Sequence, residues 1–137
     1  MGSCTGGFGD CDGSAGTGCE APLNTVQNCG TCGIVCTNAN GATACVGGAC
    51  APTCAAGYAD CDGNANNGCE TSLRTNTDCG ACGVTCARTN AAASCTTGAC
   101  TLASCNPGFG NCDGSAVNGC ETNTSSSTSH CGGCGLA

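Results

Sequence analysis

Large apolar side chains are scarce in this chain of 137 residues, which has no Trp, one Tyr and two Phe. Leu, Ile, Val and Phe together contribute 12 residues, about 9% of the chain, where a chain that folds around a packed core has roughly 20% or more. Such a chain cannot offset its conformational entropy by burying apolar surface alone. It must therefore be either disordered or held together by covalent cross-links.

Positive charge is also nearly absent, since Arg74 and Arg88 are the only basic residues and the formal net charge is −7. Nothing in the chain could neutralise phosphates or an anionic membrane surface, which excludes nucleic acids and lipid headgroups as expected partners. No apolar run approaches the roughly 18 residues of a transmembrane helix, so we expect no membrane insertion. With one His and no Lys, no nucleophile and base pair can be nominated, and we expect the protein not to be an enzyme.

Cysteine is abundant instead, at 21 residues, and its spacing repeats. The eight cysteines from Cys4 to Cys50 recur fifty residues later, from Cys54 to Cys100, and a third set begins at Cys105. This period predicts tandem copies of one module at residues 4–53 (copy 1), 54–104 (copy 2) and, in part, 105–137 (copy 3). The predicted fold is a small disulfide-rich protein of short β-hairpins and irregular loops with little helix, arranged as an elongated array.

Disulfides are the favoured use of these cysteines, and metal-thiolate chemistry is the alternative. The spacing Cys29-x2-Cys32-x3-Cys36, repeated from Cys79, resembles that of zinc or iron-sulfur ligands. There are, however, many more cysteines than a four-ligand site uses. Disulfides require an oxidising compartment, so we expect a secreted, extracellular or cell-surface protein. Residues 1–3 have no signal-peptide character, and we interpret them as a cloning remnant on a fragment of a longer secreted protein.

The pairing of the cysteines has two readings at this stage. Residues 42–50 and 92–100 are typical of two short strands around a four-residue loop containing Gly, which would set two cysteines opposite each other as a staple. Cys45 would then pair with Cys50 and Cys95 with Cys100, leaving Cys131 or Cys134 unpaired, because 21 is odd. In the other reading Cys50 pairs with Cys54 and Cys100 with Cys105, and Cys4 is left without a partner.

Acidic residues gather in one motif, which holds eight of the nine carboxylates. In the second copy, oxygen-bearing side chains stand at loop positions 1, 3, 5 and 11, close to the 1, 3, 5 and 12 of an EF-hand loop. This pattern predicts calcium sites, and its alternative is turn chemistry in which the Asp residues form Asx-turns and the Glu accepts from a backbone amide. The candidate ligands are Asp10, Asp12 and Glu20; Asp60, Asp62, Asn64 and Glu70; and Asn111, Asp113 and Glu121.

Two further positions are equivalent in all three copies. Asn28, Asp78 and His130 each precede a Cys-Gly turn, and we expect their side chains to accept a hydrogen bond from that turn. The three aromatic residues, Phe8, Tyr58 and Phe109, are expected to cover a disulfide, with carbohydrate stacking as the alternative role.

Several families resemble parts of this pattern. The Asp-x-Asp-Gly loops between cysteines resemble thrombospondin type 3 calcium repeats, and Cys105-Asn106-Pro107-Gly108-Phe109 resembles the last loop of EGF-like modules. The whole pattern, with Asn-Gly-Cys-Glu at 67–70 and Cys-Gly-Ala-Cys-Gly at 79–83, is similar to cysteine-rich tandem repeats of large secreted bacterial proteins. That resemblance brings no known activity.

Repetition without a catalytic constellation favours a structural role. We expect an extracellular spacer, adhesion element or fibre subunit, stapled by disulfides and stiffened by calcium, whose partners are other protein chains or copies of itself. A module that binds a ligand or a surface, including ice, is the second hypothesis. Its basis is the threonine pairs Thr75-x-Thr77 and Thr122-x-Thr124, which resemble ice-facing pairs.

Overall fold

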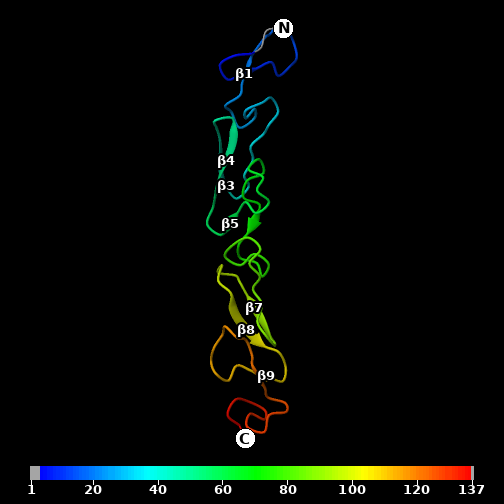
Figure 1. Cartoon of the computed structure of the whole chain (residues 1–137), viewed down its shortest axis with the longest axis vertical. Helices are drawn as coiled ribbons and strands as arrows, with labels where there is room; N and C mark the ends of the chain where they lie inside the picture. The colour runs from blue at the N-terminus through cyan, green and yellow to red at the C-terminus, as the bar shows by residue number, and fades with distance from the viewer. Residues whose placement is uncertain (1–3, 137) are drawn as a thin grey trace. The chain divides into compact units, whose positions relative to one another are not determined.

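The structure is a computed structural model and describes residues 4–136, so the residues 1–3 interpreted as a cloning remnant lie outside it. Residues 4–136 contain no helix, and hence no helix that could span a membrane. The strands form two-stranded antiparallel pairs, which confirms a small disulfide-rich fold of short hairpins and loops (Figure 1). They are β1 (Phe8–Gly9), β2 (Ala21–Pro22), β3 (Gly41–Val46), β4 (Ala49–Cys54), β5 (Tyr58–Ala59), β6 (Thr71–Ser72), β7 (Ala91–Ser94), β8 (Thr101–Cys105), β9 (Phe109–Gly110) and β10 (Thr122–Asn123).

The chain divides into two compact units, one ending at Thr71 and the other starting at Ser72. This division falls inside copy 2, so that the first unit contains copy 1 together with the first disulfide loop of copy 2. The second unit contains the remainder of copy 2 and copy 3. The copy boundaries at residues 53 and 104 and the elongated form of the array stay predictions from the sequence.

Disulfide bonding involves every described cysteine except Cys131. Bridges at equivalent positions have nearly the same separation in sequence, such as 15 residues for Cys4–Cys19, Cys54–Cys69 and Cys105–Cys120. Cys61 and Cys82 are disulfide-bonded as well. The other bridges are Cys11–Cys32, Cys29–Cys45, Cys36–Cys50, Cys79–Cys95, Cys86–Cys100 and Cys112–Cys134.

The predicted hairpin staple is wrong, although the hairpin itself is present. Strands β3 and β4 pair with Cys45 opposite Cys50, but Cys45 is bonded to Cys29 and Cys50 to Cys36. The alternative pairing of Cys50 with Cys54 is wrong too, because Cys54 is bonded to Cys69. A bridge from Cys45 to Cys50 would close only a very short loop. The observed bridges span 16 and 14 residues, restrict the unfolded chain more and anchor the hairpin to the preceding loop.

The second hairpin differs from the first at its turn. In β3–β4 the ladder continues to Val46 and Ala49 around Gly47 and Gly48, both of which have positive φ, as a tight two-residue turn requires. In β7–β8 the last pair is Ser94 with Thr101, and Cys95 and Cys100 lie in the connecting loop. Thr97 stands where Gly47 does, and a β-branched residue resists positive φ. The expected placement of Cys95 opposite Cys100 in a ladder is therefore wrong.

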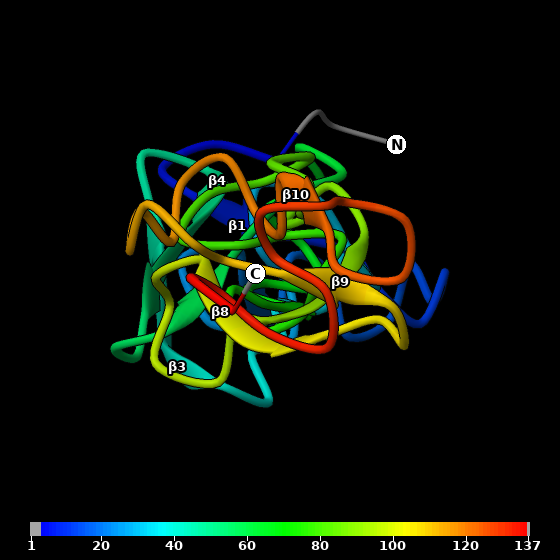
Figure 2. The ribbon, with the colours of Figure 1, turned by 90° about the horizontal axis from the view of Figure 1, so that it is seen from below.

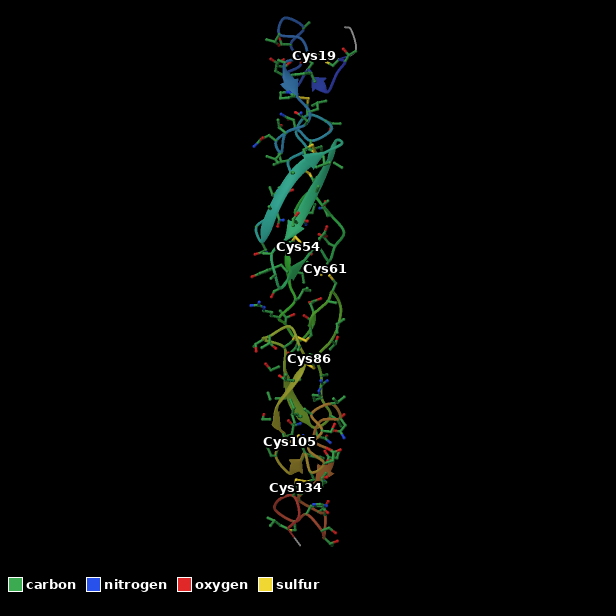
Figure 3. The ribbon with its side chains drawn as sticks, turned by 90° about the vertical axis from the view of Figure 1, so that its left-hand side faces the viewer. Cys19, Cys54, Cys61, Cys86, Cys105 and Cys134 are labelled. Carbon is green, nitrogen blue, oxygen red and sulfur yellow. A yellow bond between two sulfur atoms is a disulfide. The ribbon has the colours of Figure 1, made fainter. Side chains whose placement is uncertain are left out.

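The buried core consists of cystine sulfur. All the buried hydrophobic residues among those described are cysteines, and four of them, Cys29, Cys69, Cys95 and Cys120, are at most 2% exposed. Figure 3 shows the disulfides as yellow bonds, with Cys54 at the end of β4. The short pair β9–β10 is seen from below in Figure 2. Bridges thus take the place of the missing apolar core, as the composition predicts.

Candidate cation-binding loops

The acidic loop of copy 2 is closed by its own carboxylates. The Cys61 amide donates to Glu70 Oε1 at 2.8 Å, and the Gly63 amide donates to Asp60 Oδ1 at 2.8 Å. Asp62 accepts at 2.8 Å from the Asn64 amide through Oδ1 and from the Asn67 side chain through Oδ2. The bond from residue i+2 to the Asp carboxylate is an Asx-turn, so the alternative reading of this motif is present in the structure.

The loops of copies 1 and 3 repeat the bonds to the Glu and to the Asp at loop position 3. The Cys11 amide donates to Glu20 Oε1 at 2.8 Å, and the Cys112 amide donates to Glu121 Oε1 at 2.7 Å. Asp12 and Asp113 each accept from the amide two residues on, at 2.8 Å. The Glu at loop position 11 therefore holds the start of every loop.

These hydrogen bonds lower the pKa of several carboxyl groups. The Ser14 amide, followed by the Thr17 hydroxyl, holds the pKa of Asp12 below its ordinary 3.8. The Asn67 side chain and the Asn64 amide do the same for the pKa of Asp62, and the Ser115 amide and Asn118 side chain for that of Asp113. The backbone amides of Glu70 and Glu121 themselves contribute to lowering the pKa of each. The loops are thus built to keep these groups ionised.

Two of the loops also bring three carboxylates together. One oxygen from each of Asp10, Asp12 and Glu20 lies within 4.8 Å of the others, and the same holds for Asp60, Asp62 and Glu70. Carboxylate oxygens at this spacing are hard ligands of the kind that calcium takes, although calcium needs six to eight oxygen ligands. Backbone carbonyls and water would have to complete the set. The donor chemistry therefore fits calcium, and the same carboxylates also make the hydrogen bonds that close each turn.

The remaining predicted ligands are Asn64 in copy 2 and the three residues of copy 3. Asn64 Oδ1 accepts from the Asn66 amide at 3.3 Å, which commits that oxygen to the turn. In copy 3 only Asp113 and Glu121 carry charge, and Asn111 stands at the first position. The Oδ1 atoms of Asp10 and Asn111 are buried without a hydrogen-bond partner, whereas Asp60 Oδ1 has one.

The cysteine triplets are not metal ligands in this structure. Sulfur atoms of Cys29, Cys36 and Cys50 lie within 4.8 Å of one another, but each belongs to a disulfide. Their proximity comes from two adjacent bridges in the core of the first unit. An oxidised sulfur has no thiolate to offer a metal.

The predicted caps on the Cys-Gly turns are confirmed. Asn28 Oδ1 accepts from the Gly33 amide at 2.9 Å and Asp78 Oδ1 from the Gly83 amide at 2.8 Å. His130 Nδ1 accepts from the Gly135 amide at 2.9 Å. Three different side chains thus perform one structural role, and His130 is committed to it.

Two of the aromatic rings are partly exposed, and three of the paired threonines make local hydrogen bonds. Phe8 is 47% and Tyr58 37% exposed, so the two rings cover their surroundings only in part. The hydroxyls of Thr75 and Thr77 bond to each other at 3.0 Å, and Thr77 also donates to Asp78. The Thr122 hydroxyl donates to Glu121. These threonines serve local turns.

Sequence reasoning missed a set of asparagines that join one copy to the next. Asn40 Nδ2 donates to the Cys69 carbonyl at 2.7 Å, and the Cys69 amide donates to Asn38 Oδ1 at 3.1 Å. Asn90 Nδ2 donates to the Cys120 carbonyl at 3.3 Å. The available signal was an Asn immediately before the first hairpin strand in both complete copies.

No family model, curated protein or solved structure matches this chain. The assignment of a function rests on the chain's own chemistry.

Proposed function

We propose that this chain is an extracellular structural and interaction protein: a disulfide-stapled spacer, adhesion element or fibre subunit with calcium in its acidic loops. The observation that supports it best is the overlap of the bridges. Cys4–Cys19, Cys11–Cys32, Cys29–Cys45 and Cys36–Cys50 each begin before the preceding one has closed. No segment of copy 1 between its first and last cysteine lies outside a covalent loop.

The location follows from the same chemistry. Extensive disulfide bonding indicates an oxidising environment. Secretion or display at the cell surface is the finer proposal, and it is supported by the number of disulfides, which a reducing cytosol would not maintain. Other protein chains, including copies of this one, are the proposed partners.

Calcium is proposed as a stiffener of the loops. Each ion would neutralise carboxylates that otherwise repel one another, in loops where few bases lie nearby. Asp10, Asp12 and Glu20 would hold it in copy 1, and Asp60, Asp62 and Glu70 in copy 2. Asp113 and Glu121 would hold it more weakly in copy 3, because Asn111 carries no charge.

Immunogold labelling of the source cells tests location and assembly together. Antibodies against the folded chain should label intact, unpermeabilised cells or material outside them, in spaced or fibrous arrays. Thiol labelling of the protein taken from the same cells should detect few free cysteines. Label confined to the cell interior, with most thiols reduced, would contradict the proposal.

A further inference from the structure

Three equivalent disulfide loops, closed by Cys4–Cys19, Cys54–Cys69 and Cys105–Cys120, differ in how they are covered. Cys69 and Cys120 have no exposed surface, whereas Cys19 is exposed. The equivalent residues share a sequence, Gly-Cys-Glu, so the difference does not come from the loop itself. It comes from what packs on it.

In the first unit, the segment Thr37–Asn40 ahead of β3 covers the Cys54–Cys69 loop. Its asparagines Asn38 and Asn40 bond to the amide and the carbonyl of Cys69. The Thr37 amide donates to the Asn66 carbonyl at 2.8 Å. The fit is close, since a Cβ added to Gly68 would lie 2.7 Å from Asn38 Cβ.

In the second unit, the segment Arg88–Asn90 ahead of β7 covers the Cys105–Cys120 loop, and a backbone carbonyl takes the place of the Asn38 side chain as acceptor for the loop cysteine's amide. The Cys120 amide donates to the Thr89 carbonyl at 2.9 Å, and Arg88 Nε donates to the Ala116 carbonyl at 2.8 Å. A Cβ on Gly119 would collide with Thr89. Two independent joints therefore pair the amide and the carbonyl of the equivalent loop cysteine with the same segment of the preceding copy.

No described residue covers the corresponding edge of the Cys4–Cys19 loop, residues 16–19. The amide and carbonyl of Cys19 and the carbonyl of Gly16 make no hydrogen bond to any described residue. A Cβ on Gly18 would meet nothing within 4 Å, although the φ of Gly18, +72°, is close to the +80° of Gly68. With the same backbone shape, the amide and carbonyl of Cys19 thus have no partner among the described residues, whereas the other two loops pair the equivalent groups with a neighbour.

We propose that residues 16–19 form a docking edge for a disulfide-bonded β-hairpin of the same type, with an asparagine ahead of its first strand. The asparagine would donate to the Cys19 carbonyl, as Asn40 does to that of Cys69. Charge agrees with this partner, because the edge lies beside Asp12 and Glu20 and the segment from Thr37 to Cys54 has no acidic residue. Both described hairpins already cover a loop, so the partner is a further repeat with an unengaged hairpin.

This inference rests on the proposed structural role and names the partner within it. Figure 3 places Cys19 at the end of the first unit away from the β3–β4 hairpin, where a preceding repeat could reach it. Repeats would then continue in one direction through the same joint, whether they belong to a longer chain or to a neighbouring one.

The first arm of the test compares amide exchange within the 137-residue chain by NMR. The Cys69 and Cys120 amides should exchange at least tenfold more slowly than the Cys19 amide. The double substitution Asn38→Ala and Asn40→Ala should bring the Cys69 amide to the rate of Cys19 and leave Cys120 unchanged. A Cys69 amide that stays protected in this variant would overturn the proposal, because the asparagines would not be the cover.

The second arm adds a further copy of residues 4–53 directly before Cys4 of the full chain. We expect the Cys19 amide of the original chain to become at least tenfold slower, and the two Asn→Ala changes in the added copy to reverse this. Gly18→Ala should prevent the protection by filling the edge. Gly13→Ala is the matched control, because Gly13 has a φ of +70° and open space but lies outside the edge.

Disulfide mapping of the fusion confirms that the added copy has closed its own bridges. An unchanged Cys19 amide beside a correctly bridged added copy would overturn the docking edge. Immunogold labelling outside the cell would still support the structural role in that case, so the two proposals fail separately. Should the added copy not form its bridges, the comparison of Cys69 with Cys19 in the first arm decides.

Discussion

At the scale of single residues, one acceptor in front of each Cys-Gly turn closes that turn, and its chemical type is free to vary. Asn28, Asp78 and His130 differ in charge and shape but place an acceptor 2.8 to 2.9 Å from an amide five residues on. What is required at this position is a lone pair and not a charge.

This requirement predicts different outcomes for two substitutions of one residue. Asp78→Asn should be tolerated, because Asn28 already makes the same bond in copy 1. Asp78→Ala should leave the Gly83 amide without its acceptor and speed its exchange about fivefold, which corresponds to a net hydrogen-bond contribution of about 1 kcal/mol. Amide exchange at Gly83 measures both, with Gly33 as the internal reference. Equal rates in the two variants would contradict the role of the acceptor.

The acidic loops should respond to pH in a defined direction. The pKa values of Asp12, Asp62 and Asp113 are lowered by hydrogen bonds that exist in the folded chain. The stability that these bonds contribute is therefore fully present above the ordinary pKa of 3.8 and is lost as the pH falls through the lowered folded values. Amides of Ser14, Asn64 and Ser115 should exchange faster, relative to their intrinsic rates, at pH 2 than at pH 6.

The bridges should hold the remaining structure through this acid change. Amides of the β3–β4 ladder serve as the control, since no carboxylate bonds to them. Carboxyl groups that titrate at or above their ordinary pKa in NMR spectra would contradict the expected direction.

At the scale of elements, the two hairpins show how one turn residue sets the length of a ladder. The ladder β3–β4 reaches the Gly47–Gly48 turn, and β7–β8 stops earlier, at Ser94 and Thr101. Copy 2 also has one more residue than copy 1, and the register shift between Ala92 and Ala93 absorbs it as a bulge.

Thr97→Gly should extend the second ladder. Two consecutive glycines at 97 and 98 permit positive φ at both turn positions, so Cys95 should come to face Cys100 as Cys45 faces Cys50. Cross-strand NOEs between residues 95 and 100 would report the change, while the Cys79–Cys95 and Cys86–Cys100 bridges persist. Thr96→Gly, which leaves Thr97 in place, is the control and should not extend the ladder.

The hairpins, the turn acceptors and the dominance of disulfides could be predicted from the sequence, because spacing and composition govern them. It predicted that Cys131 or Cys134 would be unpaired, and Cys131 is the free cysteine. The reason differs from the expected one, because Cys45 does not pair with Cys50. The Cys131 equivalents Cys29 and Cys79 pair with cysteines sixteen residues further on, and the chain has none after Cys134. Connectivity itself could not be predicted, because it depends on which sulfurs the loops bring together and not on their order.

The acidic loops could be located but not fully interpreted from the sequence. Oxygen spacing is the same for a cation site and for Asx-turns, and the structure shows the turn bonds beside clustered carboxylates. The hydrogen bonds from the asparagines to the next copy could not be predicted from the sequence, for a different reason. Asn38 and Cys69 are 31 residues apart, and no local pattern links them.

At the scale of the whole molecule, stability should depend on the bridges far more than on any apolar side chain. Leu73 is only half-buried, and Leu73→Ala should cost less than about 2 kcal/mol, below a typical core deletion. Each bridge typically contributes about 2 to 4 kcal/mol, so reduction should unfold the chain completely. A dispersed NMR spectrum that survives excess reductant would contradict a framework made of disulfides.

Bound calcium should make a second, smaller contribution to the stability of the chain. Three ions would change the formal charge from −7 to −1, and the expected dissociation constants are roughly 10⁻⁴ to 10⁻³ M. Calorimetry should show the loop of copy 3 to be the weakest, and Asn111→Asp should strengthen it. No heat up to about 10 mM calcium, together with a melting temperature that chelator leaves unchanged, would mean that the carboxylates only make turns.

The overlapping bridges also decide how the chain responds to being pulled from its ends. The shortest covalent route through copy 1 runs from Cys4 to Cys11, crosses to Cys32, continues to Cys36 and crosses to Cys50. Fully stretched, this route spans roughly 50 Å, whereas the same residues without bridges would reach about 160 Å. Tension would therefore be carried by covalent bonds after a short extension, and the chain would act as a tether of nearly fixed length.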